Sequence, residues 1–321
     1  MGIHSWATFL TKCPAVSAQL QQASAQAVQK GACNGIPVDW LSPMERQIPK
    51  MQSTLTKQAA KQQKNEVLAL LSDDDACDFQ SNGGTGAGAY LLPTPEDASC
   101  KLMPDAHFCT CIRDRLLLSV CSPNSTCQHR KADGSLCNTP LDSRGRHARK
   151  CKCQGLVDVR HNNLRDWAAS SWYSCMNERV TKEQHVPAWD IINSRGETVE
   201  AILDVATTDP STGIPLYFDV CVWTAHSLNP STLHTRAQHP GRAAADAAAS
   251  KHRRYARAGS LLQPLPLEAG GRPGEDFINF VRRCGAAASE DEPEACSRLW
   301  FEASTILQRA NAELILAANG T

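Results

Sequence analysis

The sequence has no long hydrophobic run, no excess of either charge and no secretory leader, and each absence excludes a class of protein. No apolar stretch reaches the roughly 18 residues of a membrane-spanning helix, so we expect no membrane partner. The 33 basic and 33 acidic residues balance, so a signal for a nucleic-acid partner must lie in local patches. The opening MGIHSWATFL lacks the basic region and apolar core of a secretory signal. We therefore expect a nuclear or cytoplasmic protein in a reducing environment.

Cysteine, by contrast, is abundant, at 15 of 321 residues. In a reducing compartment, clustered cysteines indicate metal ligands before disulfides. Hydrophobic residues make up 42% of the chain, which is sufficient for a packed core. The length fits two modest domains or one domain with an extended arm.

Composition divides the chain into four segments. Residues 1–83 are predicted to form a Gln/Ala-rich helical arm, with AVSAQLQQASAQAVQK and MQSTLTKQAAKQQKNEVLALL as its clearest helices, and to end in an acidic, Gly-rich loop or linker. The glycines of this linker do not form a phosphate-binding loop, because no Gly-Lys-Ser/Thr follows them. The other segments are a short linker helix with a Cys/His cluster at 84–158, an α/β core at 159–288 and a C-terminal helix at 289–321.

Two aspartates lie on two β-like runs that a turn connects. The runs are Glu197–Val205 and Pro215–Trp223, and the intervening TTDPSTGI contains Asp-Pro and Gly as turn formers. An antiparallel hairpin folded symmetrically about the middle of this turn places Asp204 directly opposite Asp219. Directly opposed residues point to one face, with Cβ atoms roughly 5 Å apart.

Two carboxylates so close repel each other unless a cation lies between them or one is protonated. The pattern therefore predicts a hard cation with oxygen ligands, Mg²⁺ or Mn²⁺, at Asp204 and Asp219. Lys251 follows on an alanine-rich helix, and two carboxylates with an amine suit metal-assisted cleavage of a phosphodiester. The alternatives are an exposed sheet face or loop-end cap for the aspartates and a solvated helix face for the lysine.

A second candidate metal site lies in the loop-rich stretch between residues 121 and 153. Three thiols and an imidazole fit structural zinc, and the last two ligands, four residues apart, lie on one face of a helical turn. Unmetallated thiols are the alternative, and the first ligand is open among Cys121, Cys127 and Cys153. The predicted ligands are Cys127, Cys137, His147 and Cys151.

Positive charge collects in the same part of the chain and again after the lysine. Such clusters suit a phosphate backbone, and a solvated basic surface is the alternative. The candidate nucleic-acid contacts are Arg144, Arg146, Arg149, Lys150, Arg160, His161 and Arg165, with Arg253 and Arg254 in the later KHRRYAR ridge.

The runs LCNTPLDSRGRHARKC and VRHNNLRDW, the two aspartate strands and AAASKHRRYA together resemble a known family. They resemble the C-terminal region of non-LTR retrotransposon polyproteins, in which a zinc knuckle and an Arg-His-Asn segment precede a restriction-like endonuclease of the PD-(D/E)xK superfamily. The resemblance covers about residues 84–285. It implies a zinc- and magnesium- or manganese-containing DNA endonuclease that nicks target DNA to prime reverse transcription.

The resemblance also implies roles for single residues. Asp204 and Asp219 stand at the two motif carboxylates, and Lys251 stands at a lysine that has migrated from the strand to the following helix. Glu183 matches an acidic position on the first core helix, and the Arg-His-Asn segment begins at Arg160.

Three positions depart from the family pattern. Leu203 replaces the motif proline, Arg146 replaces an acidic residue, and Cys221 stands where an in-strand lysine would be. Proline contributes backbone shape and no ligand, so the first change should be tolerated. The third change makes the expected activity depend on Lys251.

The sequence contains no Tyr-x-Asp-Asp signature of a reverse transcriptase. The resemblance therefore implies double-stranded DNA as the partner, with element RNA and a separately supplied reverse transcriptase as further partners. A catalytically inactive or domesticated zinc-containing module that binds nucleic acid is the alternative function.

The order helix, hairpin, helix, strand predicts an α/β fold. We expect a mixed β-sheet flanked by helices, like the core of restriction endonucleases, preceded by the zinc knuckle and the helical arm. The segment LLQPLPLEAGGRPG is the last predicted strand, and EDFINFVRRCGAA and SRLWFEASTILQRANAELILAA are the closing helices.

Overall fold

The computed structural model describes residues 48–93, 103–289 and 291–321, with side chains from residue 56 onward. The chain forms two units, Met1–Leu71 and Ser72–Thr321. In the first unit, helix α3 (Ile48–Leu70) confirms the second predicted helix of the arm. The first predicted helix, at 15–30, lies outside the described residues.

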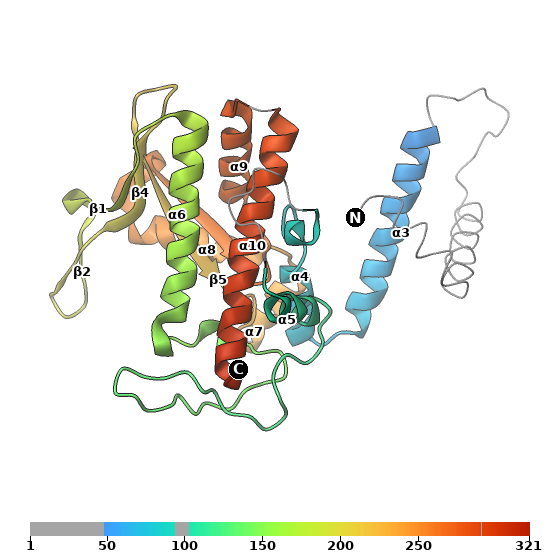
Figure 1. Ribbon diagram of the computed structural model, residues 1–321. Coiled ribbons are helices and arrows are strands. Elements are labelled where there is room, and N and C mark those ends of the chain that lie inside the picture. Colours follow the sequence, from blue (N-terminus) through green and yellow to red (C-terminus); the bar gives the residue numbers. More distant parts are fainter. Residues whose placement is uncertain (1–47, 94–102, 290) are drawn as a thin grey trace. The chain divides into compact units, whose positions relative to one another are not determined.

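The second unit is built on a four-stranded mixed sheet (Figure 1). The strand order is β1-β4-β5-β6, with antiparallel neighbours except for the parallel pair β5 and β6. The predicted mixed α/β sheet is therefore confirmed. Its strands are β1 (Thr181–His185), β4 (Ile202–Thr208), β5 (Pro215–Trp223) and β6 (Leu262–Glu268).

Two helices cover opposite faces of this sheet. They are α6 (Leu156–Met176) and α8 (Arg242–Arg254). Phe218 packs its ring on Trp172 of α6 at 4.8 Å between centroids, whereas Asp219 contacts Lys251 of α8. Neighbouring residues of a strand point to opposite faces, so each helix has its own face.

The β4–β5 ladder has the register that a symmetrical turn predicts. It runs from Thr208 opposite Pro215 to Val205 opposite Phe218. Asp204 and Asp219 occupy the next register position, just beyond the last paired residues. The predicted extent of the first strand, Glu197–Val205, was wrong, because the structure divides this segment between β3 and β4.

The first part is β3 (Thr198–Val199), which pairs with β2 (Ile191–Ile192) in a separate hairpin. The division follows from a side chain that sequence periodicity does not reveal. Asp190 Oδ1 accepts a hydrogen bond of 2.7 Å from the amide of Ala201, which separates β3 from β4.

Aromatic side chains from the α6 face and the closing helices form the main core. Trp172, Phe218, Phe277 and Phe280 are almost completely buried there. The closing helices α9 (Glu275–Ala287) and α10 (Glu292–Asn319) and strand β6 confirm the predicted C-terminal elements. Helix α10 packs on α6, on α9 and on α5 (Asp105–Arg115), so it completes the core instead of standing apart.

The acidic segment predicted as a loop is in fact helix α4 (Asp73–Ser81). Ser72 caps it by accepting a hydrogen bond from the amide of Asp75. Three aspartates in its first turn stabilise the helix through their interaction with the positive end of the helix dipole. The helix packs on α7 (Pro230–Gln238), an element the sequence did not lead us to expect.

Three arginines predicted to contact nucleic acid instead hold α4, α5 and the Cys/His loop together. Their guanidinium groups form ion pairs within the second unit, so they do not make a solvated basic surface. The closest contacts are Arg149 with Asp114 at 2.7 Å, Arg146 with Asp78 at 2.8 Å and Arg144 with Asp75 at 3.0 Å.

We predict that Arg149→Ala lowers the free energy of unfolding by about 3–5 kcal/mol, because it leaves the buried Asp114 carboxylate without its partner. Urea denaturation at neutral pH measures the change. The control is Lys150→Ala at the exposed neighbouring position, which should be nearly neutral. Equal stability of the two variants would contradict a structural role for Arg149.

Candidate active site and metal centre

Asp204 lies at the point where strands β4 and β5 stop pairing. Its carboxylate takes the place of a strand carbonyl, since Oδ2 accepts a hydrogen bond of 2.7 Å from the amide of Val220. The other oxygen, Oδ1, lies 2.9 Å from Nε2 of His161 on α6. Both oxygens are thus held in place from two different elements.

Asp219 lies on β5 and is only 2% exposed. Its Oδ1 accepts a hydrogen bond of 2.8 Å from the ammonium group of Lys251 on α8. Its Oδ2 is buried and has no hydrogen-bond partner within the described part of the chain. One carboxylate oxygen of the pair is therefore left available for a further ligand.

The two carboxylates differ in their electrostatics. Burial and the nearby charge of Asp204 raise the pKa of Asp219 to about 6, although Lys251 opposes this. Burial also acts to raise the pKa of Asp204, but the hydrogen bond and charge of His161 outweigh it and hold that pKa below its ordinary value.

The pKa values of both basic partners are raised. The hydrogen bond to Asp204 raises the pKa of His161. For Lys251, burial favours the neutral amine, but the charge of Asp219 outweighs burial and raises the pKa. Lys251 therefore stays protonated at neutral pH.

The donor set at this site fits a hard divalent cation. It offers two adjacent carboxylates, and the buried Oδ2 of Asp219 receives no N–H or O–H hydrogen bond within the described chain, while the Asp204 carboxyl lies close enough to raise the pKa of Asp219. Mg²⁺ is commonly held by one or two carboxylates, with water and substrate phosphates completing its coordination. Asp204 and Asp219 are the residues that would hold the ion.

Glu183 does not lie on the first core helix, as the resemblance implied, but on strand β1. Its neighbours pair Lys182 with Val205 and Gln184 with Leu203, so Glu183 stands at the register position across from Asp204. Its exposed carboxylate forms an ion pair with Arg165 of α6. Strand β1 begins at Thr181, soon after α6 ends at Met176, and its polar sequence TKEQH lacks the apolar alternation that would have marked a strand.

The two departures on the strands are both accommodated by packing. Leu203 is fully buried, in a cluster with Trp189 and Tyr255. Cys221 is buried beside the site, and burial raises the pKa of its thiol to about 12. This thiol therefore stays neutral and replaces none of the charge of the missing in-strand lysine.

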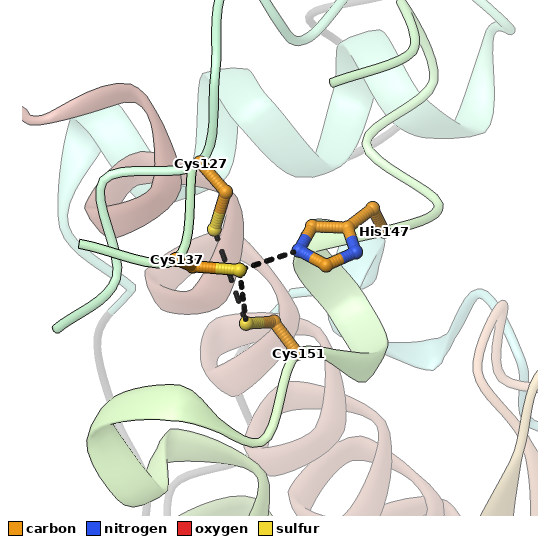
Figure 2. A group of neighbouring side chains, drawn as sticks. All are labelled: Cys127, Cys137, His147 and Cys151. Carbon is orange, nitrogen blue, oxygen red and sulfur yellow. Dashed lines mark hydrogen bonds between the residues drawn. The ribbon is translucent and has the colours of Figure 1, made fainter. Parts of the chain in front are cut away.

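A separate Cys/His cluster comes together in the loop before α6 (Figure 2). The ligand atoms of Cys127, Cys137, His147 and Cys151 all lie within 4.8 Å of one another. Cys151 Sγ is 3.9 Å from Cys127 Sγ and 3.7 Å from Cys137 Sγ. A Zn–S bond of about 2.3 Å separates tetrahedral ligands by about 3.8 Å. The four side chains can therefore bind an ion such as zinc.

Backbone hydrogen bonds build this cluster. The amide of Cys127 donates to Thr139 O at 2.9 Å, and the amide of Cys137 donates to His129 O at 2.8 Å. A hydrogen bond with the Thr139 hydroxyl lowers the pKa of the Cys137 thiol to about 6. Burial raises the pKa of the Cys127 and Cys151 thiols, so these two ligands would lose their protons on metal binding.

The structure also distinguishes between the alternative first ligands. Cys127 belongs to the cluster, whereas Cys121 and Cys153 pack around it in the same small core.

The remaining basic candidates divide into internal and exposed groups. Arg160 is 5% exposed and donates to Arg149 O and to Asn311 Oδ1. Arg165 is bound to Asp166 and Glu183. These two arginines are therefore structural. The exposed candidates are Lys150, Arg253 and Arg254.

The role of His161 is the main feature of the site that sequence reasoning missed. The sequence predicts that it contacts nucleic acid, whereas the structure places its ring beside the Asp204 carboxylate. No periodicity links positions 43 residues apart on a helix and a strand, so only the tertiary structure could join them.

The chain matches no protein-family model, and no curated protein is similar to it in sequence. Among the described residues, no helix combines the length and apolar character needed to cross a membrane. Function is therefore inferred from the geometry of the site.

We predict that the purified protein contains about one zinc ion per chain and that Cys151→Ser loses most of it, because a closed tetrahedral site needs all four ligands. Elemental analysis measures the metal. The matched control is Cys109→Ser, which alters an exposed thiol on α5. Unchanged zinc content in Cys151→Ser, or an equal loss in the control, would disprove this assignment.

We also predict that Mn²⁺ binding at the carboxylate pair weakens as the pH falls through about 6, because the proton taken up by Asp219 competes with the metal. The sign follows from the raised pKa: the carboxylate is ionised above it and neutral below it. The decline should approach about tenfold per pH unit, the limit for one competing proton. Calorimetric titration from about pH 5 to 7 measures it, and Asp219→Asn should bind weakly at every pH. A flat profile would contradict the prediction.

Proposed function

We propose that the chain is a metal-dependent DNA endonuclease of the PD-(D/E)xK superfamily that nicks duplex DNA. The observation that carries the proposal is the hydrogen bond of 2.8 Å from Lys251 Nζ to Asp219 Oδ1. Cys221 stands at the usual strand position of the lysine and stays neutral, so an amine must come from elsewhere. Helix α8 supplies it from the expected residue.

In this proposal each side chain has a distinct task. Asp204 and Asp219 bind the cation through oxygens, with Asp219 Oδ2 free of other partners in the described chain. His161 and the amide of Val220 fix the orientation of the Asp204 carboxylate. Lys251 stays protonated, so it orients the attacking water and attracts the phosphate, and it does not act as the base.

When bound, Mg²⁺ or Mn²⁺ polarises the scissile phosphate and stabilises the charge that develops on it. The pKa of Asp204 is lowered and that of Asp219 is raised, and such a difference between neighbouring carboxyls supports a catalytic role for the pair. The lowered pKa of Asp204 keeps it ionised near neutral pH. At Asp219 a proton competes with the metal as the pH falls through about 6.

The origin that we propose is the C-terminal part of a non-LTR retrotransposon polyprotein. The Cys/His cluster directly before α6, the Arg-His-Asn segment on α6 and the order helix, hairpin, helix, strand support it. In that setting the cluster holds zinc, and the nick supplies a 3′ end for a reverse transcriptase. The exposed Lys150, Arg253 and Arg254 are the predicted residues that remain suited to DNA phosphates.

Nicking of supercoiled plasmid in Mg²⁺ tests the proposal. Asp219→Asn and Lys251→Met should each lower the nicking rate by on the order of 10²-fold or more, because each removes a group that acts on the developing charge. The control is Glu200→Gln, which removes an exposed carboxylate just before β4 and should nick like the wild type.

Equal nicking by all four proteins would mean that the activity arises elsewhere, and it would refute the proposal. The absence of nicking in all four, with DNA binding retained, would favour the alternative, a zinc-containing module that binds nucleic acid without cutting it.

A further inference from the structure

Three thiols gather where helices α6, α9 and α10 pack together, outside both candidate sites. Cys175 lies in the last turn of α6, Cys284 on α9 and Cys296 near the start of α10. Cys284 belongs to the main core cluster, and Cys175 and Cys296 pack against that cluster. All three are free thiols, and neither the carboxylate pair nor the Cys/His cluster uses them.

Cys175 and Cys284 interact directly, although they stand on different helices. The thiol of Cys284 donates a hydrogen bond to the sulfur of Cys175. The Ser174 hydroxyl lies 3.9 Å from the same sulfur, and the Arg298 guanidinium adds a hydrogen bond and a positive charge. The last turn of a helix disfavours an anion, so these three neighbours are what stabilise a thiolate at Cys175.

The thiols differ in acidity as a result. The hydrogen bond from Cys284, helped by Ser174 and Arg298, lowers the pKa of Cys175 to about 6, although burial opposes it. Donating that hydrogen bond, together with burial, raises the pKa of Cys284. Burial also raises the pKa of Cys296. At neutral pH, a thiolate at Cys175 therefore lies against a neutral thiol at Cys284.

The two interacting thiols also differ in their access to solvent. Cys175 is partly exposed, whereas Cys284 is fully buried. A small solute therefore meets the thiolate first, and the second thiol is held behind it. A partly exposed thiolate beside positive charge is the reactive kind of cysteine, whereas buried structural cysteines are inert. A second thiol in contact with it is the arrangement that converts an oxidised cysteine to a disulfide.

We propose that Cys175 and Cys284 form a site of reversible oxidation, at which a hydroperoxide converts the pair to a disulfide that joins α6 to α9. The contact between the two sulfurs, the exposure of one and the burial of the other support this assignment. A dithiol reductant restores the two thiols by exchange. This oxidation is independent of the proposed nuclease activity, since Asp204, Asp219 and Lys251 take no part in it.

The reaction has two steps. The Cys175 thiolate attacks one oxygen of the hydroperoxide, so that an S–O bond forms and the O–O bond breaks. The sulfur is oxidised to a sulfenic acid, and the other oxygen leaves as water or an alcohol after taking up a proton. The Cys284 sulfur then attacks the Cys175 sulfur. The S–S bond forms, the S–O bond breaks, and the hydroxide leaves as water with the Cys284 proton.

Hydrogen peroxide is the probe that tests this site, applied to the full chain in the presence of zinc after the reductant has been removed. Remaining thiols are blocked with N-ethylmaleimide, and peptide mapping by mass spectrometry assigns the state of each cysteine. We expect a crosslinked peptide that joins Cys175 to Cys284 and a Cys296 that stays reduced. Mapping also separates this reaction from any oxidation of the Cys/His cluster.

The rate of disulfide formation should depend on pH in a diagnostic way when peroxide is scarce and the first step limits the rate. The thiolate is the attacking form and its pKa is about 6. The rate should therefore fall by about tenfold per pH unit well below that value and level off near about pH 7. An unperturbed thiol would keep gaining thiolate until roughly pH 8.5.

Three variants assign the roles of the thiols. Cys175→Ser should form no disulfide, and Cys284→Ala should stop at the sulfenic acid of Cys175, which dimedone traps. The matched control is Cys296→Ser, which alters the third thiol of the group and should form the disulfide at the wild-type rate. Because Cys284 lies in the core, mapping of the wild-type protein is the decisive measurement if that variant does not fold.

The inference would be overturned by wild-type protein in which Cys175 stays reduced, or is oxidised to a sulfinic acid without forming the disulfide. A disulfide that joins Cys296 to either of the other two thiols would overturn it as well. So would a rate that keeps rising above about pH 8, because Cys175 would then behave as an ordinary thiol.

Discussion

The close approach of Asp204 and Asp219 is the constraint on which the candidate site depends. Two buried carboxylates repel each other, and this repulsion must be balanced by positive charge or by protons. The protein uses a histidine from α6 on one carboxylate and a lysine from α8 on the other. Helices on opposite faces of the sheet thus converge on the same pair of strands, and the pair cannot be understood without both helices.

Charge has a second, structural use in the same unit. The basic cluster of the Cys/His loop includes Arg144, Arg146 and Arg149, yet all three form ion pairs with aspartates of α4 and α5. Removing one member of such a buried pair is costly, because the other member then stays charged and unpaired. The cluster of basic residues therefore fixes the Cys/His loop to the core, and the charge available to a partner is limited to other, exposed positions.

Prediction succeeded where the signal was local. The hairpin register followed from turn residues midway between two apolar runs, and the closing helices followed from periodicity. It failed at three elements, although for α4 a local signal was present, since Ser72 and the three aspartates after it cap the helix. Asp190 divides the predicted first strand by binding the Ala201 amide. Glu183 lies on β1, and the acidic segment predicted as a loop is a capped helix packed on α7.

By itself, the sequence determined the types of residue available for chemistry and their order along the chain. Three cysteines and a histidine, two strand aspartates and a later lysine can all be recognised from residue type and spacing. Only the tertiary structure decided which charged side chains are buried in ion pairs and hydrogen bonds, and which side chains of the candidate site contact one another. It buries Arg149 and Arg160, exposes Arg254, and brings His161 to Asp204. The physical reason is that burial and pairing depend on contacts between distant segments, and spacing along the chain does not encode them.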